Sequence, residues 1–361
     1  MNAEIIKRRI RAVCRLMKKQ KISCLVVTKP ANVTYTTGFL GDDSWVVITG
    51  RAVYLLTDSR YIEQAQGECR GCRIIERIAS LPETTASLLK KLKSAQAVGF
   101  EKSATLADFE ALKKQAKTQL KKAANVVEEA RSCKDSSEIS AIMAAGRIAA
   151  QALKQTRRYI KAGISESELA GRLDFQIRKL GAQNSFETIV AFGANASRCH
   201  HQPTGKKLKR NDYILIDFGA RYKGYCCDLT RCFVVGKPGG LALYKKVYDA
   251  VQRAQAAAIK MVKAGAAIKQ VDSAARETIA KYDLPVYGHG TGHGLGIEIH
   301  EEPFLNAENK GKLKAGQVIT IEPGVYIPGK LGVRIEDDVL VTESGCKILS
   351  RSCPHGPLQC G

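Results

Sequence analysis

Aromatic residues are scarce in this chain of 361 residues: they make up 6% of the sequence and include a single tryptophan. Proteins that bind single-stranded nucleic acid stack bases on aromatic side chains, so this scarcity argues against such a platform. The net charge of +22 invites a nucleic-acid interpretation. The lysines and arginines are scattered along both halves, however, so we expect a basic solvated surface and no nucleic-acid partner. A salt-dependent shift with duplex DNA would favour the alternative.

Long hydrophobic runs are also missing. No apolar run approaches the ~20 residues that a membrane-spanning helix needs. The first 20 residues lack the uninterrupted apolar core of a secretory signal. They carry Ile6, Ile10, Val13 and Met17 at helical spacing, which predicts an amphipathic helix. The sequence therefore predicts a cytoplasmic protein with no membrane partner.

Cysteine is plentiful, with 12 residues, but spacings typical of zinc sites are few. Cys69 and Cys72 form a lone CxxC without a second pair at zinc-ribbon spacing. Because intracellular disulfides are rare, we expect reduced thiols. The end of the chain carries further potential metal ligands, namely Cys346, Cys353, His355 and Cys360. Their spacing alone leaves open whether they bind a metal.

The length of the chain fits two domains. Residues 1–130 alternate apolar, β-branched runs with helical stretches, which predicts a small α/β domain. A boundary is expected near 131–135, where Asp135 or Ser136 can cap a helix. Strands and glycine-rich turns follow from residue 187, so residues 135–350 are expected to form a larger α+β domain.

Local patterns predict individual elements within these domains. β-Branched runs predict strands at 22–28, 45–49 and 53–57. Helical spacing predicts helices at 83–93, 104–118, 135–161, 165–180, 241–263 and 267–281. Ser165 with Glu168 three residues later is a capping-box pattern at the start of one of them.

Five potential metal ligands each stand in a tight local signature: Asp217, Asp228, His293, Glu322 and Glu336. Their mainly oxygen donor set suits Mn, Mg or Ca, while imidazole also suits Zn, Fe, Ni and Cu. Four carboxylates could nearly neutralise two divalent cations, and burying them without cations would be costly. The set therefore predicts the two-metal centre of a hydrolase.

The spacing of the carboxylates supports this prediction. If the chain reverses at Tyr222–Lys223, Asp217 and Asp228 face each other across a hairpin, with β-carbons about 5 Å apart. Glu322 and Glu336 are symmetric about Gly329 and can face each other in a second hairpin. Two aspartates or two glutamates so placed repel each other unless cations lie between them.

The histidines gather around the same motifs. The chain has six, and the five near the motifs are His200, His201, His289, His293 and His300. Glycine fills every second place of residues 288–296, and glycine lets the backbone approach a ligand closely. This concentration favours a ligand role for His293 over that of a packed core histidine.

The ordered set of five ligands resembles that of the pita-bread metallopeptidases, which include Xaa-Pro aminopeptidases, prolidases and methionine aminopeptidases. Residues 135–350 resemble their catalytic domain. Residues 1–130 resemble the creatinase-type N-terminal domain of the Xaa-Pro branch. The sequences YTTGF at residues 35–39 and TDSRY at residues 57–61 support this resemblance. Methionine aminopeptidases generally lack such a domain, so the Xaa-Pro branch is favoured. The implied fold class is α+β, a pita-bread domain preceded by a smaller α/β domain.

This resemblance implies two divalent metal ions per chain, with manganese favoured over cobalt, zinc or iron. All five residues would be ligands, a metal-bridging hydroxide would be the nucleophile, and Glu322 would take its proton. The implied catalytic residues besides Glu322 are His200, His289, His300 and Arg334. His200 is placed near the scissile bond, and His289 and His300 at the substrate pocket. Cys199 is a departure, because the family often has proline there.

The implied function is that of an exopeptidase that hydrolyses the N-terminal Xaa-Pro bond of peptides. An X–Pro bond has no N–H and a fixed φ, so it requires a dedicated pocket. A prolidase that acts only on dipeptides is the nearest alternative. A metal-free binding protein of the same fold is a more distant one, which the complete set of ligand types opposes. The resemblance also implies a homodimer.

Overall fold

The computed structural model describes residues 3–92, 95–116, 118–355 and, for the backbone, 358–360. The chain divides into two compact units, Met1–Arg131 and Ser132–Gly361. Within the described residues, no helix combines the length and the apolarity needed to cross a membrane.

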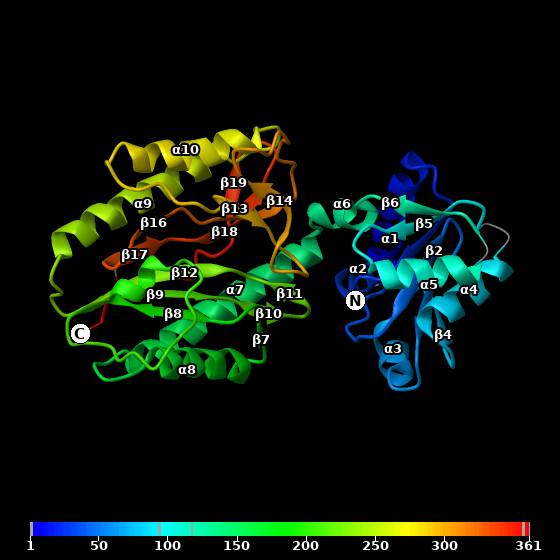
Figure 1. Cartoon of the computed structure of the whole chain (residues 1–361), viewed down its shortest axis with the longest axis horizontal. Coiled ribbons are helices and arrows are strands. Elements are labelled where there is room, and N and C mark those ends of the chain that lie inside the picture. Colours follow the sequence, from blue (N-terminus) through cyan, green and yellow to red (C-terminus); the bar gives the residue numbers. More distant parts are fainter. Residues whose placement is uncertain (1–2, 93–94, 117, 356–357, 361) are drawn as a thin grey trace. The chain divides into compact units, whose positions relative to one another are not determined.

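The N-terminal unit is built around one six-stranded sheet with strand order β4-β3-β2-β1-β5-β6 (Figure 1). Its strands are β1 Cys24–Val27, β2 Trp45–Thr49, β3 Val53–Thr57, β4 Arg73–Glu76, β5 Val98–Glu101 and β6 Leu120–Ala123. The helices described in this part of the chain are α1 Ala3–Lys19, α2 Pro30–Thr37, α3 Ile62–Glu68, α4 Leu81–Lys91, α5 Leu106–Ala116 and α6 Val126–Ser132. The pairs β1–β2 and β2–β3 are antiparallel, and the remaining pairs are parallel.

The predicted strands and helices of this unit are confirmed, with ends that shift by up to two residues. Residues 93 and 117, at or near the predicted helix ends, lie outside the described residues. The sequence patterns did not predict α2, because seven of its eight residues are buried. A helix without a polar face has no amphipathic period to detect.

The C-terminal unit places its strands between two pairs of helices (Figure 1). The helices are α7 Ser136–Thr156, α8 Glu166–Lys179, α9 Leu241–Met261 and α10 Ile268–Ala280. One apolar core lies between α7, α8 and the strands β8, β9 and β12. A second core packs α9 and α10 against β8, β9 and β12 and against strands that follow the two helices in sequence. The four helices were predicted, but α7 ends at Thr156 rather than near residue 161, where a short 3₁₀ turn replaces it.

The strands of this unit form several small sheets. They are β7 Gln183–Asn184, β8 Ile189–Phe192, β9 Asp212–Phe218, β10 Ala220–Tyr222, β11 Tyr225–Cys226, β12 Leu229–Val235, β13 Gly292–Gly294, β14 Glu301–Leu305, β15 Val318–Ile321, β16 Gly324–Ile327, β17 Leu331–Arg334, β18 Asp337–Val341, β19 Cys346–Ile348 and β20 Leu358–Cys360. Three sheets carry residues of the site: β20-β12-β9-β8, β14-β13-β15-β18-β19 and β16-β17.

The first predicted hairpin forms, but its register differs from the prediction by two residues. The partner of Asp217 is Thr230, not Asp228. The chain reverses at Lys223–Gly224, where both residues have positive φ, as a two-residue type I′ turn requires. Since side chains alternate with a period of two, Asp228 still lies on the same face as Asp217.

The second predicted hairpin has the predicted register. Val325 pairs with Val333 around Gly329, and Ile321 pairs with Asp337 in the same symmetry. The strands break between these pairs, at Glu322 and Glu336. The two glutamates therefore sit where one ladder ends and the next begins.

Candidate active site

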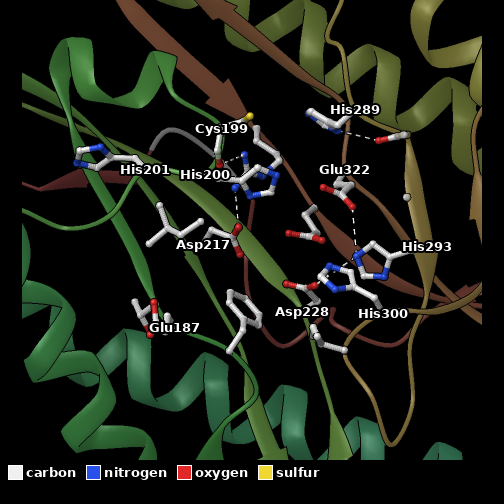
Figure 2. A pocket seen from close by; sticks show the side chains of 18 of the residues that line it. Glu187, Cys199, His200, His201, Asp217, Asp228, His289, His293, His300 and Glu322 are labelled. Atoms are coloured by element: carbon white, nitrogen blue, oxygen red, sulfur yellow. Dashed lines mark hydrogen bonds and ion pairs between the residues drawn. The ribbon is translucent and has the colours of Figure 1, made fainter. Parts of the chain in front are cut away.

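A cavity of about 510 Å³ opens between the strands of the C-terminal unit. Its lining includes all five predicted ligands and all three predicted catalytic histidines (Figure 2). Asp217 lies on β9, Asp228 immediately before β12 and His293 on β13. Segments that are far apart in the sequence thus meet at one pocket.

The ligand atoms of Asp228, His293 and Glu336 all lie within 4.8 Å of one another, and the three residues are buried. Glu322 extends the cluster, because its Oε1 lies 3.4 Å from His293 Nε2. Asp228 Oδ2 lies 3.6 Å from the same nitrogen. The fifth residue, Asp217, lines the same cavity.

His293 is prepared to present one ring nitrogen to the cluster. Its Nδ1 lies 3.0 Å from the carbonyl oxygen of Gly294, which accepts the Nδ1 proton. Nε2 then carries the lone pair and faces Asp228 and Glu322. Burial also lowers the pKa of His293, which favours the neutral, ligating form.

The chemistry of these donors fits divalent cations. Burial, then repulsion by Glu336 and the other carboxylates, raises the pKa of Asp228 well above its usual range. The pKa of Glu336 is raised in the same way, and that of Glu322 rises to about 7 because of burial. Asp217 Oδ1 is buried without a hydrogen-bond partner in the described structure. Bound cations would stabilise all of these groups as anions.

Arg334 contacts ligands and pocket residues through all three of its guanidinium nitrogens. Nη2 donates to Asp217 at 2.5 Å, and Nη1 donates to Tyr326 at 2.8 Å and to the Cys199 carbonyl at 3.2 Å. Nε donates to Thr230 at 3.1 Å, and Thr230 in turn donates to Glu336 at 2.6 Å. Arg334 is 3% exposed, and its guanidinium group hydrogen-bonds to protein groups.

His289 is held at the end of the same chain of hydrogen bonds. Its Nδ1 lies 2.7 Å from the Gly290 carbonyl oxygen, and its Nε2 lies 3.0 Å from the Tyr326 hydroxyl. Burial lowers the pKa of His289 to about 4, so the ring is neutral and Nε2 accepts from Tyr326. The hydrogen bonds are therefore donated in one direction: Arg334 donates to Tyr326, and Tyr326 donates to His289.

His200 and His300 present exposed imidazoles to the cavity. The rings of His300 and His293 meet edge to face, with centroids 4.5 Å apart. Partial burial, followed by the neighbouring His293 and His200, lowers the pKa of His300. Figure 2 shows His200 on the side of Asp217 and His300 on the side of His293, with the ligand cluster between them.

The cysteine-containing motifs lie elsewhere. Cys69 and Cys72 lie in the N-terminal unit, and the cysteines whose side chains are described form no disulfide. His355 pairs with the buried Asp337, and the Cys353 carbonyl oxygen accepts from Arg231. These contacts tie the chain end to the fold. The side chain of Cys360 lies outside the described residues.

Two residues that hydrogen-bond to histidines of the cavity lining, Tyr326 and Glu166, were not predicted from the sequence. Tyr326 could have been found, since a strand period of two places it on the same face as Glu322. His201 was noted only as part of the histidine cluster, yet its ring is buried against Glu166 at 2.9 Å. No local pattern announces Glu166, which lies 35 residues away.

Comparison with known proteins agrees with this arrangement. Residues 140–343 match the model of metallopeptidase family M24, and residues 9–133 match that of the creatinase/prolidase N-terminal domain. An uncharacterized peptidase of Bacillus subtilis is 39% identical over 342 residues, which cover 93% of this chain and 94% of the relative.

Solved structures give the same result. A structure described as the Xaa-Pro dipeptidase from Bacillus anthracis is 33% identical, with a TM-score of 0.93 over 98% of this chain and 99% of the other. The X-Pro aminopeptidase from Thermotoga maritima is 34% identical, with a TM-score of 0.88 over 96% and 99% of the two chains. The expected fold class, a creatinase-type domain followed by a pita-bread domain, is confirmed. The chain therefore belongs to metallopeptidase family M24, whose members use divalent metal ions, and carries a creatinase/prolidase-type N-terminal domain.

Proposed function

We propose that this chain is an exopeptidase that hydrolyses the bond between an N-terminal residue and a following proline, including in peptides longer than two residues. The observation that carries the proposal is the convergence of five ligand-type side chains at one buried pocket of an M24 chain. They are Asp217, Asp228, His293, Glu322 and Glu336. We take residues 1–130 and 135–350 as the proposed limits of its two domains.

We assign these five residues to two divalent cations, with manganese as the first expectation. Bound cations of this kind make water acidic enough to attack at neutral pH and polarise the scissile carbonyl. Glu322 is the proposed acceptor of the water's proton. Its side chain is 17% exposed, compared with 12% for Asp217 and 7% for Asp228, so it reaches the open part of the cavity.

The imidazoles around the cluster are assigned to the substrate. His200 and His300 are exposed on two sides of the ligands and can contact the scissile peptide from both. His289 is neutral and fixed by Tyr326, which suits a wall of the pocket for the proline ring. Arg334 acts by holding Asp217, Thr230 and Tyr326 in place.

The hydrogen bonds of Arg334 bear on how long a peptide the site accepts. A strict dipeptidase must bind the carboxylate of its product-side residue, and a guanidinium is the usual partner. Arg334 donates to four protein groups instead, and the other basic residues described in the cavity lining are histidines. An open cleft that admits further residues is therefore favoured. The dipeptidase alternative is supported by the similar structure from Bacillus anthracis, which is described as an Xaa-Pro dipeptidase.

The test compares Ala-Pro with Ala-Pro-Phe, each with and without N-acetylation, using the metal-loaded enzyme. We expect release of alanine from both free peptides and from neither acetylated form, because an exopeptidase must recognise the free amine. Cleavage of Ala-Pro alone would establish the dipeptidase instead. Cleavage of neither free peptide would refute both.

A further inference from the structure

One buried carboxylate outside the ligand cluster makes hydrogen bonds with several residues of a single loop. The Glu166 side chain, at the start of α8, is 0% exposed. Its Oε1 accepts from Phe192 N at 2.8 Å and from Asn195 Nδ2 at 2.8 Å. Its Oε2 lies 2.9 Å from His201 Nε2 and accepts from Thr204 N at 3.0 Å and Thr204 Oγ1 at 2.6 Å. Both ends and the middle of segment 192–204 therefore meet at this carboxylate.

The opposite side of this segment faces the active site. The Cys199 carbonyl oxygen accepts from Arg334, and Cys199 and His200 line the cavity. In the described part of the chain, the His200 imidazole makes no hydrogen bond or ion pair. Its place is therefore set by the backbone that carries it. Figure 2 shows the His200 ring beside the ligands and the ring of His201 away from them.

We propose that Glu166 is a positioning residue for His200: by holding segment 192–204 at both ends, it fixes the backbone from which His200 reaches the substrate. This inference rests on the proposed function, in which His200 contacts the scissile peptide. Glu166 itself touches neither substrate nor metal.

The pattern of donors requires a carboxylate at this place. Phe192 N and Thr204 N are backbone donors that cannot reverse, and they bind different oxygens of Glu166. A glutamine has one oxygen, so its NH₂ group would face one of these N–H groups whichever way the amide turned. Although burial opposes the anion, the bonds from Thr204, His201 and the others keep the pKa of Glu166 below its ordinary value.

The experiment uses Glu166→Gln and, as matched control, Glu168→Gln. Glu168 belongs to the same helix turn and loses the same charge, but among the described residues its carboxylate accepts only from Ser165 and Lys207. We expect Glu166→Gln to lower kcat by roughly 10- to 100-fold, because a shift of about 1 Å in a reacting group can cost about 10²-fold. KM and metal content should change little, and Glu168→Gln should keep kcat within about twofold of the parent.

A double-mutant cycle with His200→Ala separates positioning from a general loss of structure. If Glu166 acts through His200, then Glu166→Gln should alter kcat by less than about twofold in the His200→Ala background. Multiplicative effects of the two changes would overturn the inference. Should Glu166→Gln fail to fold, Thr204→Val removes the hydroxyl that donates to Glu166 and accepts from Lys206 N, and it enters the same cycle with a smaller expected effect.

Hydrogen exchange provides a readout that does not depend on activity. Peptides covering residues 193–203 should exchange faster in Glu166→Gln than in Glu168→Gln, while peptides from β9 should not differ. Equal exchange in the two variants would refute the inference that Glu166 holds segment 192–204. A wild-type enzyme that cleaves no Xaa-Pro peptide would refute the proposed function, while the exchange comparison would still decide whether Glu166 holds the segment.

Discussion

Arg334 orders the active site without being available to the substrate. The family resemblance places it among the implied catalytic residues. The structure instead shows it donating to Asp217, Thr230, Tyr326 and the Cys199 carbonyl. It is a buried positive charge among carboxylates, so it balances part of their repulsion and fixes their orientation. At the residue scale, Arg334 and Thr230 thus orient the ligand carboxylates through hydrogen bonds without being proposed as metal ligands themselves.

Asp228 gives the sharpest test of the ligand cluster. Burial and four neighbouring carboxylates raise the pKa of this side chain well above its usual range. We expect Asp228→Asn to fold and to lose bound metal and activity by more than about 100-fold, since even outer-shell partners are worth about 10–100-fold. Metal analysis and cleavage of Ala-Pro-Phe measure both. Glu187→Gln is the control, because Glu187 lines the same cavity but is exposed. Unchanged metal content in Asp228→Asn would contradict the assignment.

At the scale of elements, sequence periodicity predicted the faces of strands better than their register. Because the type I′ turn lies at Lys223–Gly224, the partner of Asp217 is Thr230 and not the predicted Asp228. A shift of two residues leaves Asp228 on the same face of the sheet as Asp217. Around Gly329 the symmetry was correct because the turn residue itself was identified. Glu166 and Tyr326 were missed because their partners come from distant elements, and local patterns carry no information about such contacts.

The glycines around His293 test how tightly one element is packed. A methyl group on Gly292 would overlap the carbonyl oxygen of Thr320 on the neighbouring strand β15, whereas Gly288 has open space around it. We expect Gly292→Ala to lower the free energy of unfolding by about 1–3 kcal/mol and to weaken metal binding, since overpacked strands must separate. Gly288→Ala should behave like the parent. Equal unfolding transitions in denaturant for the two variants would contradict this packing.

For the whole molecule, the charge of +22 governs how copies of the chain meet. We expect a homodimer, as the family resemblance implies, with a mass near twice 39.3 kDa by light scattering. Because like charges repel, the dimer should strengthen from low salt to about 0.15 M, where the Debye length falls to about 8 Å. A monomer at micromolar concentration in both conditions would count against an interface of ordinary size.

The raised pKa values of Asp228 and Glu336 make metal uptake a proton exchange. A raised pKa means that each carboxyl group binds a proton more readily in the metal-free fold, so protons compete with a cation for these groups. Affinity should therefore fall as the pH is lowered, and loading should release protons that calorimetry in two buffers of different ionisation enthalpy can count. An equal heat in both buffers would mean that no proton leaves. We therefore expect mild acid to remove metal, and with it activity, at a pH where the fold is still intact by circular dichroism.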